Sequence, residues 1–182
     1  MERKTLDELF EHLMALVEQR QYRELREQLG EMNEVDVATF IEEELPEDRV
    51  VPVFRMLHKD LAVDVFANLS PDVQEHIIRS ITDKELSVIM DELYVDDAVD
   101  MLEELPANLV KRVLQSANPE TRKLVNEFLK YEEDSAGSIM TAEFVDVKAG
   151  MTVSDAIGHI KRTAVDKETV YTCFVTDTAR HL

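Results

Sequence analysis

An acidic helix carries the residues in this chain that are best suited to binding chemistry. In the segment 94–105 the apolar residues recur at the spacing of one buried helical stripe, namely Ala98, Val99, Leu102 and Leu105. At about 100° per residue the carboxylates gather elsewhere on the helix, as Asp96, Asp100, Glu103 and Glu104 on the opposite face and Asp97 at its margin. Like charges four residues apart repel by roughly 0.2–0.5 kcal/mol per pair in an isolated helix. Such a face is either left to water or holds a cation.

No arrangement of residues in the sequence indicates catalysis. The five histidines are scattered without the spacing of metal ligands, and the one cysteine, Cys173, lies among expected strand residues. Neither a glycine-rich phosphate loop nor a serine nucleophile elbow is present. The chain is therefore predicted not to be an enzyme.

The charge of the chain favours cations as ligands. Its formal net charge is -19, and between residues 83 and 104 nine acidic side chains accompany a single lysine. Because nucleic acid binding depends on a basic face, nucleic acid is not an expected partner. No run of 18 or more apolar residues occurs, so the segment itself is expected to be soluble.

Residues 1–130 have the pattern of a repetitive helical domain. The motifs Val65-Phe66-x-x-Leu69 and Met101-Leu102-x-x-Leu105 lie 36 residues apart, and Phe40-Ile41-x-x-x-Leu45 begins a looser copy. The five prolines are placed at expected helix starts, and Thr82-Asp83-Lys84-Glu85 is a capping box. Short repeated helices must stack to bury their apolar faces. The predicted fold is mainly α, a right-handed helical solenoid of stacked short helices.

The pattern changes after residue 130. Residues 131–141 are polar, contain Gly137 and indicate a junction. Residues 142–182 then predict a strand at 143–147, a capped helix from Val153 to Arg162 and a second strand at 170–176. A strand, a crossover helix and a second strand make an α/β unit. Because two strands are marginal alone, the expectation is a truncated domain, or one completed by another copy.

Three segments together resemble the MgtE family of magnesium channels and transporters. Residues 133–141 have the sequence EDSAGSIMT, a strand and Met151-Thr152-Val153 follow, and residues 96–100 have the sequence DDAVD. In that family a helical N-terminal domain passes into the first cystathionine-β-synthase-type (CBS) domain at such a junction. The resemblance implies a partial CBS domain at 142–182. It also implies that the parent protein places this region on the cytoplasmic side of the cell membrane, before further CBS and transmembrane domains, as a homodimer.

The resemblance also implies ligands. Asp96 and Asp100 match positions that contribute to an interdomain Mg2+ site. Asp97 and Glu104 would mainly add to the negative electrostatic potential around it. Partner carboxylates are expected outside the chain, and Mg2+, Mn2+ and Ca2+ all accept carboxylate oxygen. Tyr171, at the start of the second strand, is the candidate to stack on the adenine of ATP or another adenine nucleotide.

The function implied is that of a cytosolic Mg2+-sensing region, which gates the pore through Mg2+-dependent domain closure. Two alternatives stay open on the residues alone. One is a helical-repeat scaffold for protein interactions. The other is an adenine-nucleotide sensor that acts through the CBS part.

Overall fold

The computed structural model describes residues 3–132, 135–179 and 181–182. The helices are α1 (Arg3–Glu18), α2 (Tyr22–Leu29), α3 (Glu34–Thr39), η1 (Phe40–Glu44), α4 (Glu47–Phe54), α5 (Lys59–Ala67), α6 (Pro71–Ser80), α7 (Asp83–Glu92), α8 (Val95–Glu104), α9 (Ala107–Ser116), α10 (Pro119–Phe128), α11 (Val153–Thr163) and η2 (Ala164–Asp166). The strands are β1 (Phe144–Lys148) and β2 (Thr169–Thr176). None of the helices in the described ranges is long and apolar enough to cross a membrane. The predicted class, mainly α with a small α/β part, is confirmed.

The chain divides into two compact units. The first consists of residues 1–93 and 100–122, and the second of residues 94–99 and 123–182. The second unit therefore combines the first residues of α8 with the later part of α10 and the segment β1–α11–β2. The junction predicted at 131–141 includes residues 133–134, which lie outside the described residues. The division predicted at residues 130 and 141 stays a prediction.

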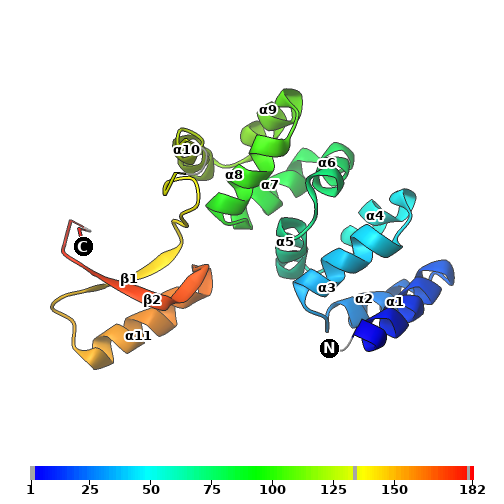
Figure 1. The fold of residues 1–182 in the computed structure, drawn as a ribbon, viewed down its shortest axis with the longest axis horizontal. Helices are drawn as coiled ribbons and strands as arrows, with labels where there is room; N and C mark the ends of the chain where they lie inside the picture. The colour runs from blue at the N-terminus through cyan, green and yellow to red at the C-terminus, as the bar shows by residue number, and fades with distance from the viewer. Residues whose placement is uncertain (1–2, 133–134, 180) are drawn as a thin grey trace. The chain divides into compact units, whose positions relative to one another are not determined.

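Successive helices of the first unit stack in the manner of a helical repeat (Figure 1). Helices two positions apart in the chain pack together, as α3 does with α5, α5 with α7, and α7 with α9. The 36-residue offset holds for whole elements, because α6 and α9 start 36 residues apart and so do α7 and α10. The six apolar residues of the repeated motif are all buried: Val65, Phe66, Leu69, Met101, Leu102 and Leu105. Burial of one stripe per helix is what stabilises such a stack.

Local signals explain where most of these helices begin. The capping box at Thr82 is formed, since its hydroxyl oxygen accepts from the Glu85 N–H while the Glu85 carboxylate accepts from the Thr82 N–H. Pro52 corrects the expectation for the prolines, because it lies inside α4 rather than at its start. Its side chain is exposed there, in a helix of eight residues whose buried face is made by valines and a phenylalanine. Tertiary packing therefore outweighs the missing N–H at this position.

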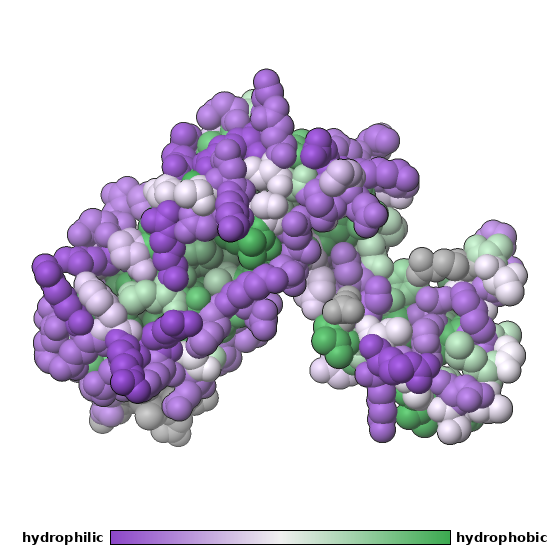
Figure 2. All heavy atoms as spheres, turned by 180° about the vertical axis from the view of Figure 1, so that it is seen from behind, coloured by the Kyte–Doolittle hydropathy of each residue, from purple (hydrophilic) through white to green (hydrophobic). Residues whose placement is uncertain are grey.

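The second unit contains a parallel pair of strands joined by α11. Strand β1 pairs with β2, with Phe144 opposite Thr169 and Lys148 opposite Thr176. Helix α11 begins at a capping box formed by Thr152 and Asp155, as predicted. No residue of α11, all of which are described, is buried. Figure 2 accordingly shows hydrophobic side chains at the surface of this part of the chain, where the exposed apolar residues include Val153, Ile157, Val165 and Val175.

Candidate cation site

The start of the parallel sheet brings two carboxylates to one edge. Glu143 and Glu168 are the residues that directly precede β1 and β2. Because Phe144 pairs with Thr169 in a parallel register, the two glutamates lie side by side. The Thr169 N–H donates to the Glu143 carbonyl oxygen at 3.5 Å, which extends the ladder to this position. The fold thus creates a pair of like charges at the amino ends of the strands.

A third carboxylate joins them from the first turn of α8. Among the described residues, Asp96, Glu143 and Glu168 form a group in which one carboxylate oxygen of each residue lies within 4.8 Å of the other two. All three belong to the second unit. Glu143 is held in place locally, since the Thr141 hydroxyl donates to its Oε2 at 3.2 Å and accepts from its N–H at 3.1 Å. Asp96 and Glu143 are half-buried, whereas Glu168 is exposed.

Asp96 lies in an electrostatic environment that disfavours its own charge. Burial raises the pKa of its carboxyl first, and the negative charges of Glu168 and Glu143 raise it further. The N–H groups of Asp96 and Asp97 act in the opposite sense, as expected at a helix N-terminus. One oxygen of the carboxylate, Oδ1, is buried and has no hydrogen-bond partner among the described residues. A buried acceptor without a donor lowers the stability of the fold, so a bound positive charge would be stabilising at this site.

The dimensions of the group suit a hard divalent cation. Two oxygens on opposite sides of Mg2+ lie about 4.1 Å apart, and those on opposite sides of Ca2+ about 4.6–5.2 Å apart. Because the three oxygens lie within 4.8 Å of one another, they are close enough to share one such ion. Mg2+ can also be held through its bound waters, which this ion retains in many protein sites.

The structure separates the acidic residues predicted on α8. Asp96 belongs to the carboxylate group, Asp97 is half-buried, and Asp100 and Glu104 are exposed outside the group. The predictions for Asp97, Asp100 and Glu104 are untested by this geometry. Sequence reasoning missed Glu143 and Glu168. The available signal was that each acid lies at or just before a predicted strand start, since Glu143 begins the strand predicted at 143–147 and Glu168 lies two residues before the strand predicted at 170–176.

Tyr171 lies outside the wall of a cavity in the βαβ segment. Its ring is 98% exposed on β2. A cavity of about 390 Å3 lies instead between β1 and α11, where Lys148, His159 and Lys167 contribute basic groups. Lys148 is already engaged, because its Nζ donates to Asp146 Oδ2 at 2.7 Å and to Thr176 Oγ1 at 2.8 Å. The cavity wall does not include Tyr171.

Two solved structures have the same combination of stacked helices and a βαβ segment. A crystal structure of the soluble part of a magnesium transporter matches 97% of this chain and 70% of its own, with a TM-score of 0.87 and 27% sequence identity. The cytosolic domain of the Mg2+ channel MgtE in complex with ATP matches 93% of this chain and 69% of its own, with a TM-score of 0.82 and 33% identity. The fold is therefore that of the soluble part of a magnesium transporter.

The sequence places the chain in a particular family. Residues 32–134 match the family described as the MgtE intracellular N domain, and the chain belongs to this family, which is not a family of enzymes. It is 35% identical over 159 residues to the magnesium transporter MgtE of Thermus thermophilus. It is also 26% identical over 178 residues to that of Bacillus subtilis. These matches cover 85% and 98% of this chain but only 35% and 39% of the relatives' lengths.

Proposed function

We propose that this chain is a Mg2+-sensing regulatory region of a magnesium transporter, and that Asp96, Glu143 and Glu168 form one of its sensing sites. The observation that carries the proposal is the buried, unpartnered Asp96 Oδ1 within a group of three carboxylates. A divalent cation gives this oxygen the positive partner that it lacks. It also offsets the mutual repulsion of the three carboxylates. The family to which the chain belongs supports Mg2+ as the ion.

The proposed mechanism follows from the sequence separation of the three ligands. Asp96 lies on α8, whereas Glu143 and Glu168 lie at the starts of β1 and β2. Without a cation their repulsion weakens the association between the first turn of α8 and the strands. A bound cation replaces the repulsion among the three carboxylates by attraction of each to the ion. It favours the state in which α8 and the strands are associated by as much as it binds that state more tightly than the separated one. Sensing is therefore a shift between two states of this unit.

One site is too weak to act as a complete switch. A shift from 1:99 to 99:1 requires about 5.5 kcal/mol of differential binding. We therefore propose that further ions use the exposed carboxylates of α8, Asp100 and Glu104, with Asp97 adding to the field and with ligands outside this chain. In the parent protein, on the cytoplasmic side of the membrane and as a homodimer, this closure would hold the pore shut when Mg2+ is abundant.

Calorimetric titration of the whole chain tests the site itself. MgCl2 and CaCl2 are titrated into the wild type, Glu143→Gln and the matched control Glu42→Gln, which changes an exposed glutamate on η1. The expected result is saturable binding that Glu143→Gln weakens by about tenfold, or about 1.4 kcal/mol, and that Glu42→Gln preserves. Equal binding by all three proteins would remove Glu143 from the site.

The gating role needs the full-length parent protein. We expect Mg2+ to protect the region around residues 94–99 and 143–168 from protease, and Asp96→Asn to lose that protection. In transport assays the same variant should remain open at Mg2+ concentrations that close the wild type. Unaltered closure by Asp96→Asn would show that the site binds ions without controlling the pore.

Adenine-nucleotide binding is the second candidate function. It is favoured by the exposed ring of Tyr171, by the basic groups around the β1–α11 cavity, and by a similar solved domain that was crystallised with ATP. A ring on an exposed strand can stack on adenine without rearrangement. ATP binding should therefore fall in Tyr171→Ala and persist in Tyr171→Phe. Equal affinity of the two variants would exclude stacking by this residue.

A further inference from the structure

A tyrosine ring lies directly on a glycine in the connection between α10 and β1. A Cβ atom added to Gly137 would lie 2.3, 2.4 and 2.7 Å from Cδ1, Cγ and Cε1 of Tyr131. Because Cγ is the base of the ring, a rotation of the ring about its own axis does not relieve this contact. Gly137 does not have a positive φ. Glycine is therefore required at this position for the close approach of the ring and not for its backbone freedom.

The ring of Tyr131 is also held by α10. It packs edge to face on Phe128, the last residue of that helix, with the ring centroids 5.9 Å apart and 87° between the ring planes. Phe128 is buried, and its carbonyl oxygen accepts from the Tyr131 N–H at 2.9 Å. Edge-to-face packing is a favourable arrangement of two aromatic rings. Tyr131 thus joins the end of α10 to Gly137.

The chain around Gly137 forms a closed turn that leads to the cation site. The N–H and the hydroxyl of Ser138 both donate to the Ser135 carbonyl oxygen, at 3.2 and 2.9 Å. Thr141, whose hydroxyl holds the Glu143 carboxylate, follows four residues after Gly137. Four residues of chain span at most about 14 Å. The contact between ring and glycine therefore limits where β1 can begin relative to α10.

The carboxylates of the cation site come from both sides of this connection. Asp96 precedes α10 in the chain, whereas Glu143 and Glu168 follow Gly137. One oxygen of each carboxylate lies within 4.8 Å of the other two only if the strands start close to the first turn of α8. A loose connection would have to be ordered whenever the three groups come together. A site whose geometry exists before the ion arrives avoids part of that cost.

We propose that Gly137 and Tyr131 are positioning residues of the cation site, and that their contact preorganises the start of β1 for cation binding. This inference rests on the proposed function, because it assigns the two residues to the same three carboxylates. Neither residue belongs to the carboxylate group itself. A side chain at position 137 must displace the ring or shift the turn, and either change moves Glu143 relative to Asp96. Cation affinity falls although all three ligands are still present.

Two glycine-to-alanine variants of the whole chain test the proposal by calorimetric titration with MgCl2. Gly150 is the matched control, because it lies in the same unit and a Cβ atom added there would meet nothing within 4 Å. Gly137→Ala should weaken Mg2+ binding by about tenfold, and Gly150→Ala should leave it unchanged. Equal affinity of the two variants would overturn the proposal.

Removing the ring shows whether the loss arises from this contact. Tyr131→Ala should weaken Mg2+ binding as well, because it deletes the other half of the contact. Adding Gly137→Ala to Tyr131→Ala should then cause no further loss, since the added methyl group no longer meets a ring. Losses that add in the double variant would place the effect of Gly137→Ala elsewhere and would contradict the proposal.

A readout without any cation separates positioning from folding. In EDTA, a double-mutant cycle of Asp96→Asn and Glu143→Gln reports the repulsion between the two carboxylates as an interaction free energy of unfolding. This interaction should be largely lost when Gly137→Ala is the background. A purely structural role of Gly137 would leave it unchanged, because such a role would destabilise all four proteins of the cycle equally.

The same cycle distinguishes failure of the positioning role from failure of the proposed function. If the wild type shows the carboxylate interaction but binds no Mg2+, and Gly137→Ala removes the interaction, the positioning role stands and the sensing function is wrong. If Gly137→Ala keeps both the interaction and the Mg2+ affinity of the wild type, the positioning role is wrong and the cation site stands.

Discussion

Replacing Asp96 by asparagine should stabilise the chain in the absence of cations. The substitution removes two repulsive pairs whose oxygens lie within 4.8 Å, each worth roughly 0.9 kcal/mol in water and about 3.5 kcal/mol at an effective dielectric constant of 20. Because Asp96 is only half-buried and Glu168 is exposed, the water value applies more closely. Loss of a favourable charge at the N-terminus of α8 subtracts about 0.3–1 kcal/mol. The net gain is about 1 kcal/mol, or roughly 2–4 °C in Tm for a chain of this size.

Magnesium should reverse the order of stability. At free Mg2+ ten times the Kd, binding stabilises the wild type by about 1.4 kcal/mol, whereas Asp96→Asn should gain little. Thermal unfolding followed by circular dichroism, with EDTA and with MgCl2, measures both effects. Asp100→Asn is the control in the isolated chain, because it removes an exposed carboxylate one turn further along the same helix, and the ligands proposed to act with Asp100 lie outside this chain. It should preserve the response of the wild type.

The pH dependence provides a second check on the same residue. The folded-state pKa of Asp96 is raised, so its charge lowers stability above that pKa, and the penalty is relieved as pH falls through it. The advantage of Asp96→Asn should therefore be present at neutral pH and disappear in acid. A variant that is less stable than the wild type in EDTA, or that keeps the full Mg2+ response, would refute the electrostatic argument. Loss of the response in Asp100→Asn instead would assign the ligand to Asp100.

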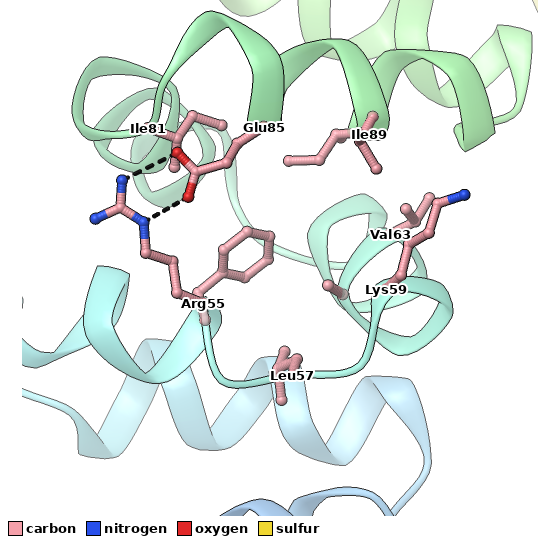
Figure 3. A pocket seen from close by; sticks show the side chains of 10 residues that line it. Arg55, Leu57, Lys59, Val63, Ile81, Glu85 and Ile89 are labelled. Atoms are coloured by element: carbon pink, nitrogen blue, oxygen red, sulfur yellow. Dashed lines mark hydrogen bonds and ion pairs between the residues drawn. The ribbon is translucent and has the colours of Figure 1, made fainter.

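Three further substitutions test the helical stack. The pKa of Glu85 is lowered to about 2, chiefly by the hydrogen bond from Arg55 (Figure 3). The ionised Glu85 therefore contributes about 1 kcal/mol to the free energy of unfolding after allowance for solvent exposure. This contribution should be lost between about pH 4.5 and 2, and it should be absent in Glu85→Gln. Arg112→Met removes donors to two backbone carbonyls at the end of α6 and should cost about 2–3 kcal/mol in urea unfolding, whereas the exposed Arg23→Met should cost under about 0.5 kcal/mol. Gln74→Leu leaves the Phe66 carbonyl without its 2.9 Å donor and should lower the unfolding free energy by about 1–3 kcal/mol.

The helical part could be predicted because its signals are local and repeated. A spacing of 36 residues between apolar motifs predicted a repeat, and the starts of α6 and α9 keep that spacing. Capping boxes at Thr82 and Thr152 fixed two further helix starts. Pro52 failed as a signal because its place in α4 is decided by packing of neighbouring valines, which is a tertiary effect. The π-helical turn η1 also had no recognisable signature in the sequence.

The candidate site could be predicted only in part, because its residues come from three separate segments. Asp96 was identified from the periodicity of α8 and from family resemblance. Glu143 and Glu168 become neighbours only through the parallel register of β1 and β2, in which Phe144 opposes Thr169. Register is a pairing of distant residues, and a strand pattern read along one segment does not contain it.

The repeat itself explains why, among the described residues, the candidate site includes Asp96 and not the equivalent acid of the preceding copy. Asp60 occupies the equivalent position 36 residues earlier, as the second residue of α5, just as Asp96 is the second residue of α8. Asp60 is exposed and lies outside the carboxylate group. An acid at this point of the repeat is therefore insufficient, and the strands that follow the second copy supply the other two carboxylates of the candidate site. Asp60→Asn is thus the stringent comparison for Asp96→Asn, since equal effects on the Mg2+ response would reduce the site to the general negative field of the chain.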